Sequence, residues 1–184
     1  MLYTGKGDNG TTSAFDCDQR FSKSSVIAEA LGTLDEVNSF LGVVKMNPLS
    51  SEMSVPGTPL KLSEVVDQAQ QNLFVAQAEV AGADKHIVQE KVDGLETMIN
   101  AIEQEIPPIK SFFVSGGTEL AALLDFARTL SRRAERRVVG VIEEGKTTVS
   151  KDTLAYLNRL SSLLYALARQ VNSKSGITEE PPRY

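Results

Sequence analysis

Residues 150–173 read SKDTLAYLNRLSSLLYALARQVNS, and this stretch carries the most regular apolar pattern in the chain. Its large apolar residues recur at intervals of three and four, which places them along one face of an α-helix. A helix with one long apolar face must bury that face against other elements, so the stretch predicts a helix packed inside a helical assembly. The residues of this apolar face are Leu154, Leu157, Leu160, Leu164, Leu167 and Val171.

The same spacing recurs upstream and predicts four more amphipathic helices. The first begins at Ser22 or Ser24, either of which can cap it, and ends at Asn47-Pro48. Alternating strand patterns are almost lacking, so the predicted fold class is all-α, a five-helix bundle. The other three helices are expected at about 62–83, 91–105 and 118–144, with loops at 47–60 and 84–90.

A length of 184 residues suits one domain, 1–184, with enough chain to bury a single core. Three parts are expected within it. Residues 1–22 form a glycine-rich segment, 23–173 form the helical bundle, and 174–184 form a loose tail.

Composition excludes several classes of protein. The net charge of −5 disfavours a nucleic-acid surface. Cys17 and His86 are the only residues of their kinds, so neither an intrachain disulfide nor a Cys/His zinc set can form. The sequence begins MLYTGKGDNG, without an apolar leader, and no segment has the pattern of a membrane span. A reducing, cytoplasmic setting without membrane contact is therefore expected.

The N-terminal run YTGKGDNGTT, residues 3–12, has the chemistry of a phosphate-binding loop. Its three glycines let the backbone turn N–H groups toward an anion, and Lys6 adds a positive charge. The run does not have Walker loop spacing and follows no predicted strand. A flexible N-terminus without a ligand is the alternative, and Asp8 alone is weak evidence for a metal.

Five of the nine arginines fall within residues 128–137, in the fourth predicted helix. Arginines four positions apart repel one another, so an anionic group should face them. Phosphate fits, because the planar guanidinium donates paired hydrogen bonds and stays charged. A solvated, salt-bridged helix face is the alternative. At 100° per residue one side holds Arg128, Arg132, Glu135 and Arg136, and Arg133 and Arg137 point elsewhere.

Two more polar positions have open interpretations. Asp35 lies away from the centre of the apolar face of the first helix, where plain solvent exposure also explains it. Asn158 lies beside the leucine stripe and could read an adenine edge or bond locally. No pair of base and nucleophile can be argued from one histidine and one cysteine. A reaction here would have to do without conventional acid–base machinery. Displacement by a strong external nucleophile with a phosphate leaving group would need only positioning and charge stabilisation.

Four blocks, in this order, resemble the PduO-type ATP:cob(I)alamin adenosyltransferase family. They span residues 3 to about 172, nearly the whole chain, and their order makes the resemblance specific. The blocks are YTGKGDNGTT at 3–12, EALGTLDEVN at 29–38, FFVSGG at 112–117 leading into ARTLSRRAER at 127–136, and LNRLS at 157–161.

The resemblance implies a cobalamin adenosyltransferase-like five-helix bundle, assembled as a homotrimer with active sites between subunits. The implied substrates are ATP with magnesium and cob(I)alamin or a related corrinoid, and the products are adenosylcobalamin and triphosphate. A reductase and an adenosylcobalamin-dependent enzyme are the further partners expected. No magnesium ligand is assigned.

The resemblance also implies residue roles by motif match. Asp35 and Arg128 match a pair that forms a salt bridge across the subunit interface in the family, and Phe112 matches an aromatic under the corrin ring. Catalytic roles fall on Arg132, Asp35, Arg128 and Lys23. The ATP site would comprise Thr4, Gly5, Lys6, Gly7, Thr12, Ser13, Lys23, Arg132, Arg133, Ala134, Glu135, Arg136 and Asn158.

Two positions depart from the family pattern. Asp125 stands where a histidine is frequent, and Ser162 stands where an aspartate often follows the LNRLS run. These departures concern corrinoid or magnesium handling and leave the reaction class unchanged. Two other functions are compatible with the residues taken alone: a nucleotide-sensing bundle that controls a partner, and a structural bundle that binds no ligand.

Overall fold

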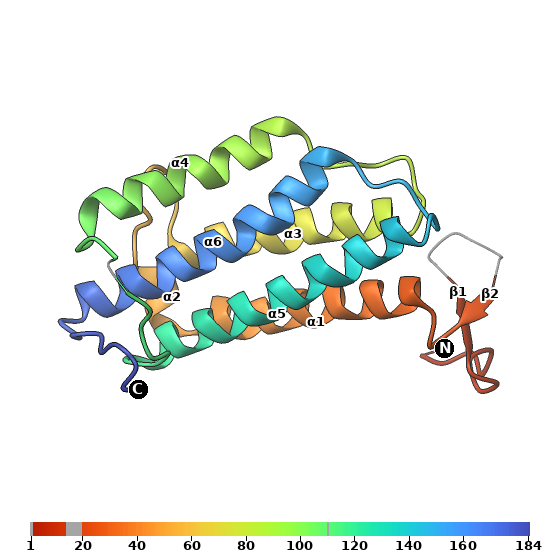
Figure 1. Ribbon diagram of the computed structural model, residues 1–184, viewed down its shortest axis with the longest axis horizontal. Helices are drawn as coiled ribbons and strands as arrows, with labels where there is room; N and C mark the ends of the chain where they lie inside the picture. Colours follow the sequence, from red (N-terminus) through yellow and green to blue (C-terminus); the bar gives the residue numbers. More distant parts are fainter. Residues whose placement is uncertain (1, 14–19, 110) are drawn as a thin grey trace.

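The computed structural model describes residues 2–13, 20–109 and 111–184. Five long helices run roughly along one axis, with a small hairpin projecting at one end (Figure 1). The all-α bundle predicted from the sequence is confirmed. The helices are α1 (Val26–Met46), α2 (Pro48–Glu52), α3 (Leu62–Val80), α4 (Gln89–Glu105), α5 (Glu119–Glu143) and α6 (Lys151–Lys174), and the strands are β1 (Thr11–Ser13) and β2 (Arg20–Ser22).

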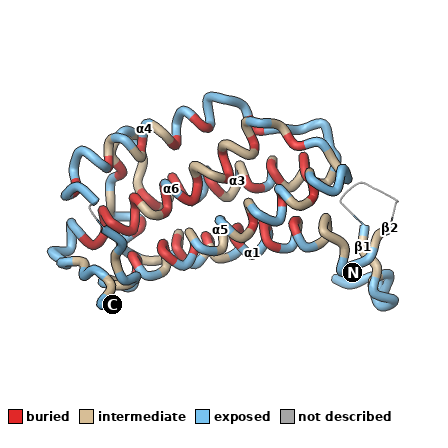
Figure 2. The backbone as a smooth tube through the Cα atoms, viewed as in Figure 1, coloured by how far each residue is buried: buried red, intermediate tan, exposed pale blue. Residues whose placement is uncertain are grey.

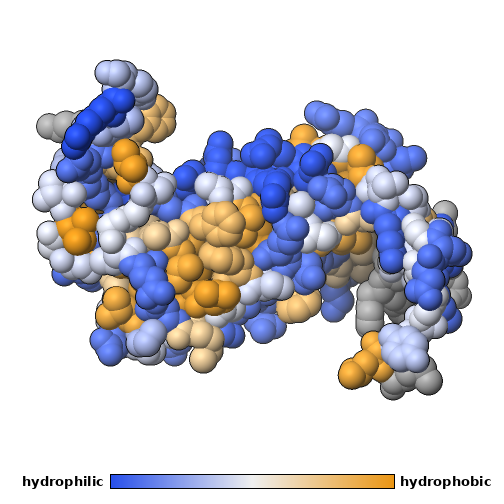
Figure 3. All heavy atoms as spheres, turned by 90° about the horizontal axis from the view of Figure 1, so that it is seen from below, coloured by the Kyte–Doolittle hydropathy of each residue, from blue (hydrophilic) through white to orange (hydrophobic). Residues whose placement is uncertain are grey.

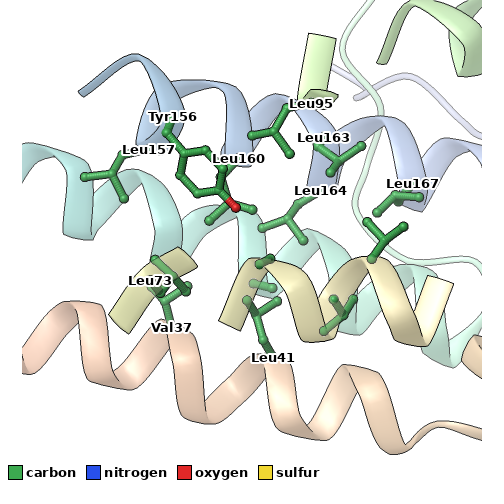
Figure 4. Packing of buried hydrophobic residues seen from close by; sticks show 14 of the residues in the cluster. Val37, Leu41, Leu73, Leu95, Tyr156, Leu157, Leu160, Leu163, Leu164 and Leu167 are labelled. Atoms are coloured by element: carbon green, nitrogen blue, oxygen red, sulfur yellow. The ribbon is translucent and has the colours of Figure 1, made fainter. Parts of the chain in front are cut away.

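The core lies where the apolar faces of the long helices meet. Helix α6 packs on α5 and α4, and α1 packs on α5 and α3. Buried residues follow the inner faces of the helices and exposed ones the outer faces (Figure 2). In Figure 4 leucines of α6 lie among side chains of the neighbouring helices. None of the helices in the described ranges combines the length and apolar character needed to cross a membrane.

The leucine stripe of α6 behaves largely as its spacing predicts. Leu157, Leu160, Leu164, Leu167 and Val171 are all at most 2% exposed. Leu154, the first member of the predicted stripe, is only partly buried against the core. The helix therefore enters the core about one turn after its beginning.

Serine and threonine side chains cap α1, α5 and α6 among the long helices. The first helix begins after both predicted caps, because Ser25 is its cap and accepts a hydrogen bond from the Ala28 N–H at 3.3 Å. Ser22 and Ser24, the predicted caps, instead share a hydrogen bond between their hydroxyls at 2.8 Å. Ser150 caps α6, with its hydroxyl accepting from the Thr153 N–H.

Two short elements lie where the sequence predicted loop. Helix α2 falls within 47–60, where Asn47 caps it and Pro48 occupies the first turn. Proline is accepted there because the N–H of that position has no partner within the helix. The glycine-rich segment contains the antiparallel β1–β2 hairpin, in which Thr11 pairs with Ser22. Cys17 lies outside the described residues.

A tyrosine hydroxyl lies deep in this core. Tyr156 of α6 is fully buried, and its hydroxyl accepts a hydrogen bond from Asn72 Nδ2 at 3.1 Å. Burial raises the pKa of Tyr156 to about 12, and the Asn72 bond lowers it by less. The unfolded chain would lose this proton near pH 10, before the folded chain does.

We therefore expect the free energy of unfolding to fall by roughly 3 kcal/mol as the pH rises from about 10 to 12. The contribution is fully present below pH 10, since both states then hold the proton. Urea unfolding of the wild type and Tyr156→Phe across this pH range measures it. The difference in free energy of unfolding between the two proteins should change with pH. A difference that is the same at every pH would contradict the raised pKa of Tyr156.

Candidate functional site

A cavity of about 750 Å³ lies between α4, α5, α6 and the connection from α4 to α5. Its aromatic lining includes Phe112 and Phe113 of that connection, and its cationic lining includes Arg128, Arg132 and Arg169. Phe112 is 82% exposed, so its ring is open to a ligand. An aromatic surface beside Arg132 suits a ligand with a large apolar face and an anionic group.

The arginines of α5 divide between two faces, as the helical periodicity predicted. Arg128 and Arg132 line the cavity. Arg133 and Arg137 instead form ion pairs with acidic residues of α1, so the predicted ATP ligand Arg133 already has a partner within the chain. The α1 partners are Glu36 for Arg133 and Glu29 for Arg137.

Arg128 is held by a carboxylate of its own chain. Its Nε lies 3.2 Å from Asp125 Oδ1, and Asp125 Oδ2 accepts from Arg169 Nη2 at 3.0 Å. Asp125 and Arg169 are each 3% exposed, which makes them a buried ion pair. A single chain does not pair Arg128 with Asp35, which lines a different cavity.

The glycine-rich segment is shaped by tight turns and by one arginine. Gly5 and Gly10 have φ angles of 67° and 79°, which residues with a Cβ rarely adopt. Arg20 Nη2 donates to the carbonyl oxygens of Lys6 at 2.6 Å and Thr11 at 2.8 Å. Arg20 was not identified from the sequence, because its partners are backbone atoms that no side-chain pattern reveals.

Lys23 returns to this segment from the beginning of α1. Its N–H donates to the Gly10 carbonyl at 2.9 Å. A Cβ added to Gly7 would lie 3.1 Å from Lys23 Nζ, so the glycine leaves room for the ammonium group. Thr4 Oγ1 accepts from the Lys6 N–H at 3.3 Å. The segment therefore collects a lysine ammonium group and turned backbone, the features expected of an anion site.

The end of the glycine-rich segment lines a second cavity, of about 540 Å³, on α1 and α3. Thr12 and Ser13 lie there with Asp35, together with Phe21 and Gln77. Three predicted site residues from two separate parts of the sequence are thus brought together. The arginines of α5 do not line this second cavity.

Glu135 and Asn158 are joined directly across α5 and α6. Asn158 Nδ2 donates to Glu135 Oε1 at 2.8 Å, and Asn158 Oδ1 accepts from Arg159 Nη1 at 2.8 Å. Arg159 Nε in turn lies 2.8 Å from Glu96 Oε1 of α4. Both ends of the Asn158 amide have partners, which fixes its orientation. Glu96 was not identified from the sequence, since it lies 63 residues from its partner.

The remaining predicted ATP ligands lie on either side of Glu135. Arg136 is exposed, and its Nη1 donates to the carbonyl of Arg132 at 3.2 Å. Ala134 is 1% exposed, so its methyl group belongs to the core and only its neighbours reach the surface.

Within one chain, the glycine-rich segment lies apart from the cavity that Phe112 and Arg132 line. The hairpin projects beside the beginning of α1, at the right of Figure 1, whereas the connection carrying Phe112 lies at the left end. The described contacts and cavities do not join the glycine-rich segment to Arg132, Asn158 or Phe112. Any ligand that spans both groups must therefore use a second copy of the chain or a large rearrangement.

Comparison with known proteins gives one consistent match. Residues 2–171 match the family model described as Cobalamin adenosyltransferase. A corrinoid adenosyltransferase of Bacillus subtilis (strain 168) is 39% identical over 180 residues, covering 96% of this chain and 89% of the relative. The corrinoid adenosyltransferase PduO of Citrobacter freundii is 38% identical over 178 residues, and the match covers 91% of this chain but 49% of that protein.

Solved structures agree with the sequence match. A variant of the PduO-type ATP:corrinoid adenosyltransferase from Lactobacillus reuteri, complexed with cobalamin and ATP, superposes with a TM-score of 0.87 at 31% identity. The match covers 100% of this chain and 97% of the other.

Proposed function

The chain belongs to the cobalamin adenosyltransferase family, and from that membership we propose that it is an ATP:cob(I)alamin adenosyltransferase. It transfers the 5′-deoxyadenosyl group of ATP to the cobalt of cob(I)alamin or a related corrinoid. The observation that carries the assignment is one cavity lined by both Phe112 and Arg132. An apolar ring face and a polyanion can meet there.

The chemistry fits the residues present. The reduced cobalt is the nucleophile: it forms a bond to C5′ of the ribose while the C5′–O5′ bond breaks, and the electron pair leaves with the triphosphate. No side chain has to be deprotonated. Arg132, Lys6 and Lys23 would stabilise the negative charge that grows on the leaving group. Asn158 and Glu135, fixed by their mutual hydrogen bond, would orient the nucleoside.

We place the complete site between subunits of a homotrimer. The separation of the glycine-rich segment from Arg132 within one chain supports this arrangement. An apolar patch on the α1–α5 face, seen in Figure 3, offers a surface for a second chain. Exposed apolar side chains on these two helices include Val43 at 52%, Met46 at 77% and Phe126 at 53% exposure. In such an assembly Asp35 of one subunit would meet Arg128 of the next.

Magnesium would enter with ATP. Among the residues that the structure describes there is no cluster of three His, Cys, Asp or Glu side chains. This fits an ion held mainly by phosphate oxygens and water, as magnesium usually is in nucleotide sites. When bound it would neutralise charge on the triphosphate. A cytoplasmic location, a separate reductase and an adenosylcobalamin-dependent acceptor complete the proposal.

Anaerobic mixing of the protein with magnesium-ATP and chemically reduced cob(I)alamin tests the reaction. The expected result is protein-dependent conversion to a light-sensitive adenosylated corrinoid with release of triphosphate. Absence of conversion, with ATP still bound, would favour a nucleotide-sensing bundle. Absence of any ATP-dependent thermal shift would favour a structural bundle.

Phe112→Ala should separate ATP binding from corrinoid activation. Phe112 offers an apolar face that would keep a lower ligand off cobalt, and a cobalt without that ligand is easier to reduce. We expect the variant to bind ATP normally but to lose the four-coordinate spectrum of cob(II)alamin in the presence of ATP. Leu49→Ala is the matched control, because Leu49 is an exposed apolar residue of α2 that lines neither cavity. An unchanged four-coordinate spectrum in Phe112→Ala would contradict this role.

A further inference from the structure

A buried guanidinium group lies directly behind the segment that carries Phe112. Arg169 of α6 is 3% exposed, and its Nη2 and Nη1 pair with Asp125 Oδ2 at 3.0 Å and Glu179 Oε1 at 2.9 Å. The guanidinium carbon lies 5.7 Å from the ring centroid of Phe113. Arg169 therefore contacts α5, the C-terminal tail and the residue next to Phe112.

The tail contacts the same segment at further points. The Val114 N–H donates to the carbonyl of Glu180 at 3.0 Å. Asn172 Nδ2 donates to Glu179 Oε1 at 2.7 Å and to the Gly116 carbonyl at 2.9 Å. The sequence predicted a loose tail, whereas the structure ties Glu179 and Glu180 to the segment that lines the first cavity.

Gly117 shows how closely α6 approaches this segment. Its φ angle is 96°, and a Cβ added there would lie 2.4 Å from Asn172 Oδ1. The same Asn172 oxygen accepts the Thr118 N–H at 3.1 Å, at the beginning of α5. The backbone on the C-terminal side of Phe112 is thus anchored to one side chain, which also holds Glu179.

Charge balance makes the tail part of this arrangement. Arg128 and Arg169 are neutralised by Asp125 and Glu179, two cations by two carboxylates. Asp125 is already shared between both arginines, so without Glu179 one buried guanidinium would lack a full counter-charge. An unpaired buried charge is costly, and this cost favours the docked tail.

We propose that Glu179 is a positioning residue that holds the C-terminal tail against residues 111–118 and thereby fixes the position of Phe112 for corrinoid binding. Glu179 does not itself line the first cavity, and it acts through Arg169 and Asn172, its two partners. The role of Phe112 in this inference rests on the proposed function. The attachment of the tail to residues 111–118 rests only on the contacts within the chain.

Glu180 provides a matched control. Its carboxylate pairs with Arg183, and both side chains are exposed, at 67% and 87%. Only its backbone carbonyl reaches Val114, and Glu180→Ala keeps that carbonyl. Glu179→Ala and Glu180→Ala therefore remove the same groups from neighbouring positions, but only the first removes a partner of Arg169.

Hydrogen–deuterium exchange of the ligand-free protein tests directly whether Glu179 holds the tail against residues 111–118. Peptides covering 111–118 should exchange about tenfold faster or more in Glu179→Ala than in the wild type, because a charge-assisted anchor is lost. Glu180→Ala should exchange like the wild type. Equal exchange in all three proteins, or equal acceleration in both variants, would overturn the proposal.

Steady-state kinetics supply the second readout. The KM for the corrinoid should rise about tenfold in Glu179→Ala while the KM for ATP stays near its wild-type value. An equal rise of both constants would indicate general loosening and would overturn the positioning role. If the wild type itself fails to adenosylate cob(I)alamin, the proposed function fails, and the exchange experiment still decides whether Glu179 holds the segment.

Discussion

Arg132→Ala is expected to lower turnover by about 100-fold or more, because it removes a donor aimed at the charge that develops on the leaving triphosphate. Loss of one such donor costs about 3–4 kcal/mol in the barrier of related oxyanion sites. In the single chain the Arg132 side chain forms no ion pair with any carboxylate in the described ranges, although it lines the cavity that holds Phe112. Its charge is therefore available to a ligand.

Arg137→Ala is the matched control on the same helix. Arg137 lies five residues further along α5, lines neither of the two cavities and pairs with Glu29 in an exposed contact at 3.4 Å. Exposed pairs contribute little, so turnover should stay within about twofold of the wild type. Initial rates at saturating ATP and cob(I)alamin give the comparison. Near-normal turnover by a folded Arg132→Ala protein would remove Arg132 from the mechanism.

The long helices were predictable because their apolar faces are long and regular. Helix α6 was expected at about 150–173 and spans Lys151–Lys174. Short elements were not predictable in this way. Helix α2 contains only five residues and each strand only three, too few to show a period. Pro48 was interpreted as a stop for the first helix, but it also begins the next.

Helical geometry also predicted which arginines share a face. It separated Arg128 and Arg132, which line the cavity, from Arg133 and Arg137, which pair with α1. Arg136 was predicted on the side of Arg128 but does not line the cavity. The spacing could not say that Arg133 would be engaged within its own chain, because Glu36 lies 97 residues away. Partners that distant in sequence are set by the packing of α1 on α5.

The buried ion cluster of Asp125, Arg169 and Glu179 could not be predicted from the sequence for the same reason. Arg169 stands among the leucines of α6, and its partner Asp125 lies 44 residues earlier. From the sequence, Asp125 was identified only as a departure from the family pattern. The structure gives the departure a physical role, since the carboxylate joins Arg128 to Arg169. Glu79 is a similar case: it is buried and accepts the Ser150 N–H at 2.6 Å, 71 residues away.

Asp125→Leu should lower the free energy of unfolding by about 3 kcal/mol, the largest loss of stability that we expect from a single substitution at this site. Removal of one partner from a buried ion pair costs about 3–5 kcal/mol, because the other charge stays buried. The lower end applies here, since Glu179 still neutralises part of the Arg169 charge. Asp67→Leu is the control: Asp67 is 52% exposed in its pair with Lys45, and its loss should cost at most about 1 kcal/mol.

The double variant Asp125→Leu/Arg169→Leu distinguishes a stranded charge from poor packing. If the cost of Asp125→Leu comes from the unpaired Arg169, removal of both charges should recover part of the lost stability, because apolar replacements of buried pairs are often neutral or stabilising. Full recovery is not expected, since Glu179 loses its Arg169 partner in the double variant. Urea unfolding at one fixed protein concentration measures all variants, since assembly would make stability depend on concentration. A double variant less stable than Asp125→Leu alone would show instead that Arg169 contributes through its contacts with Glu179 and the ring of Phe113.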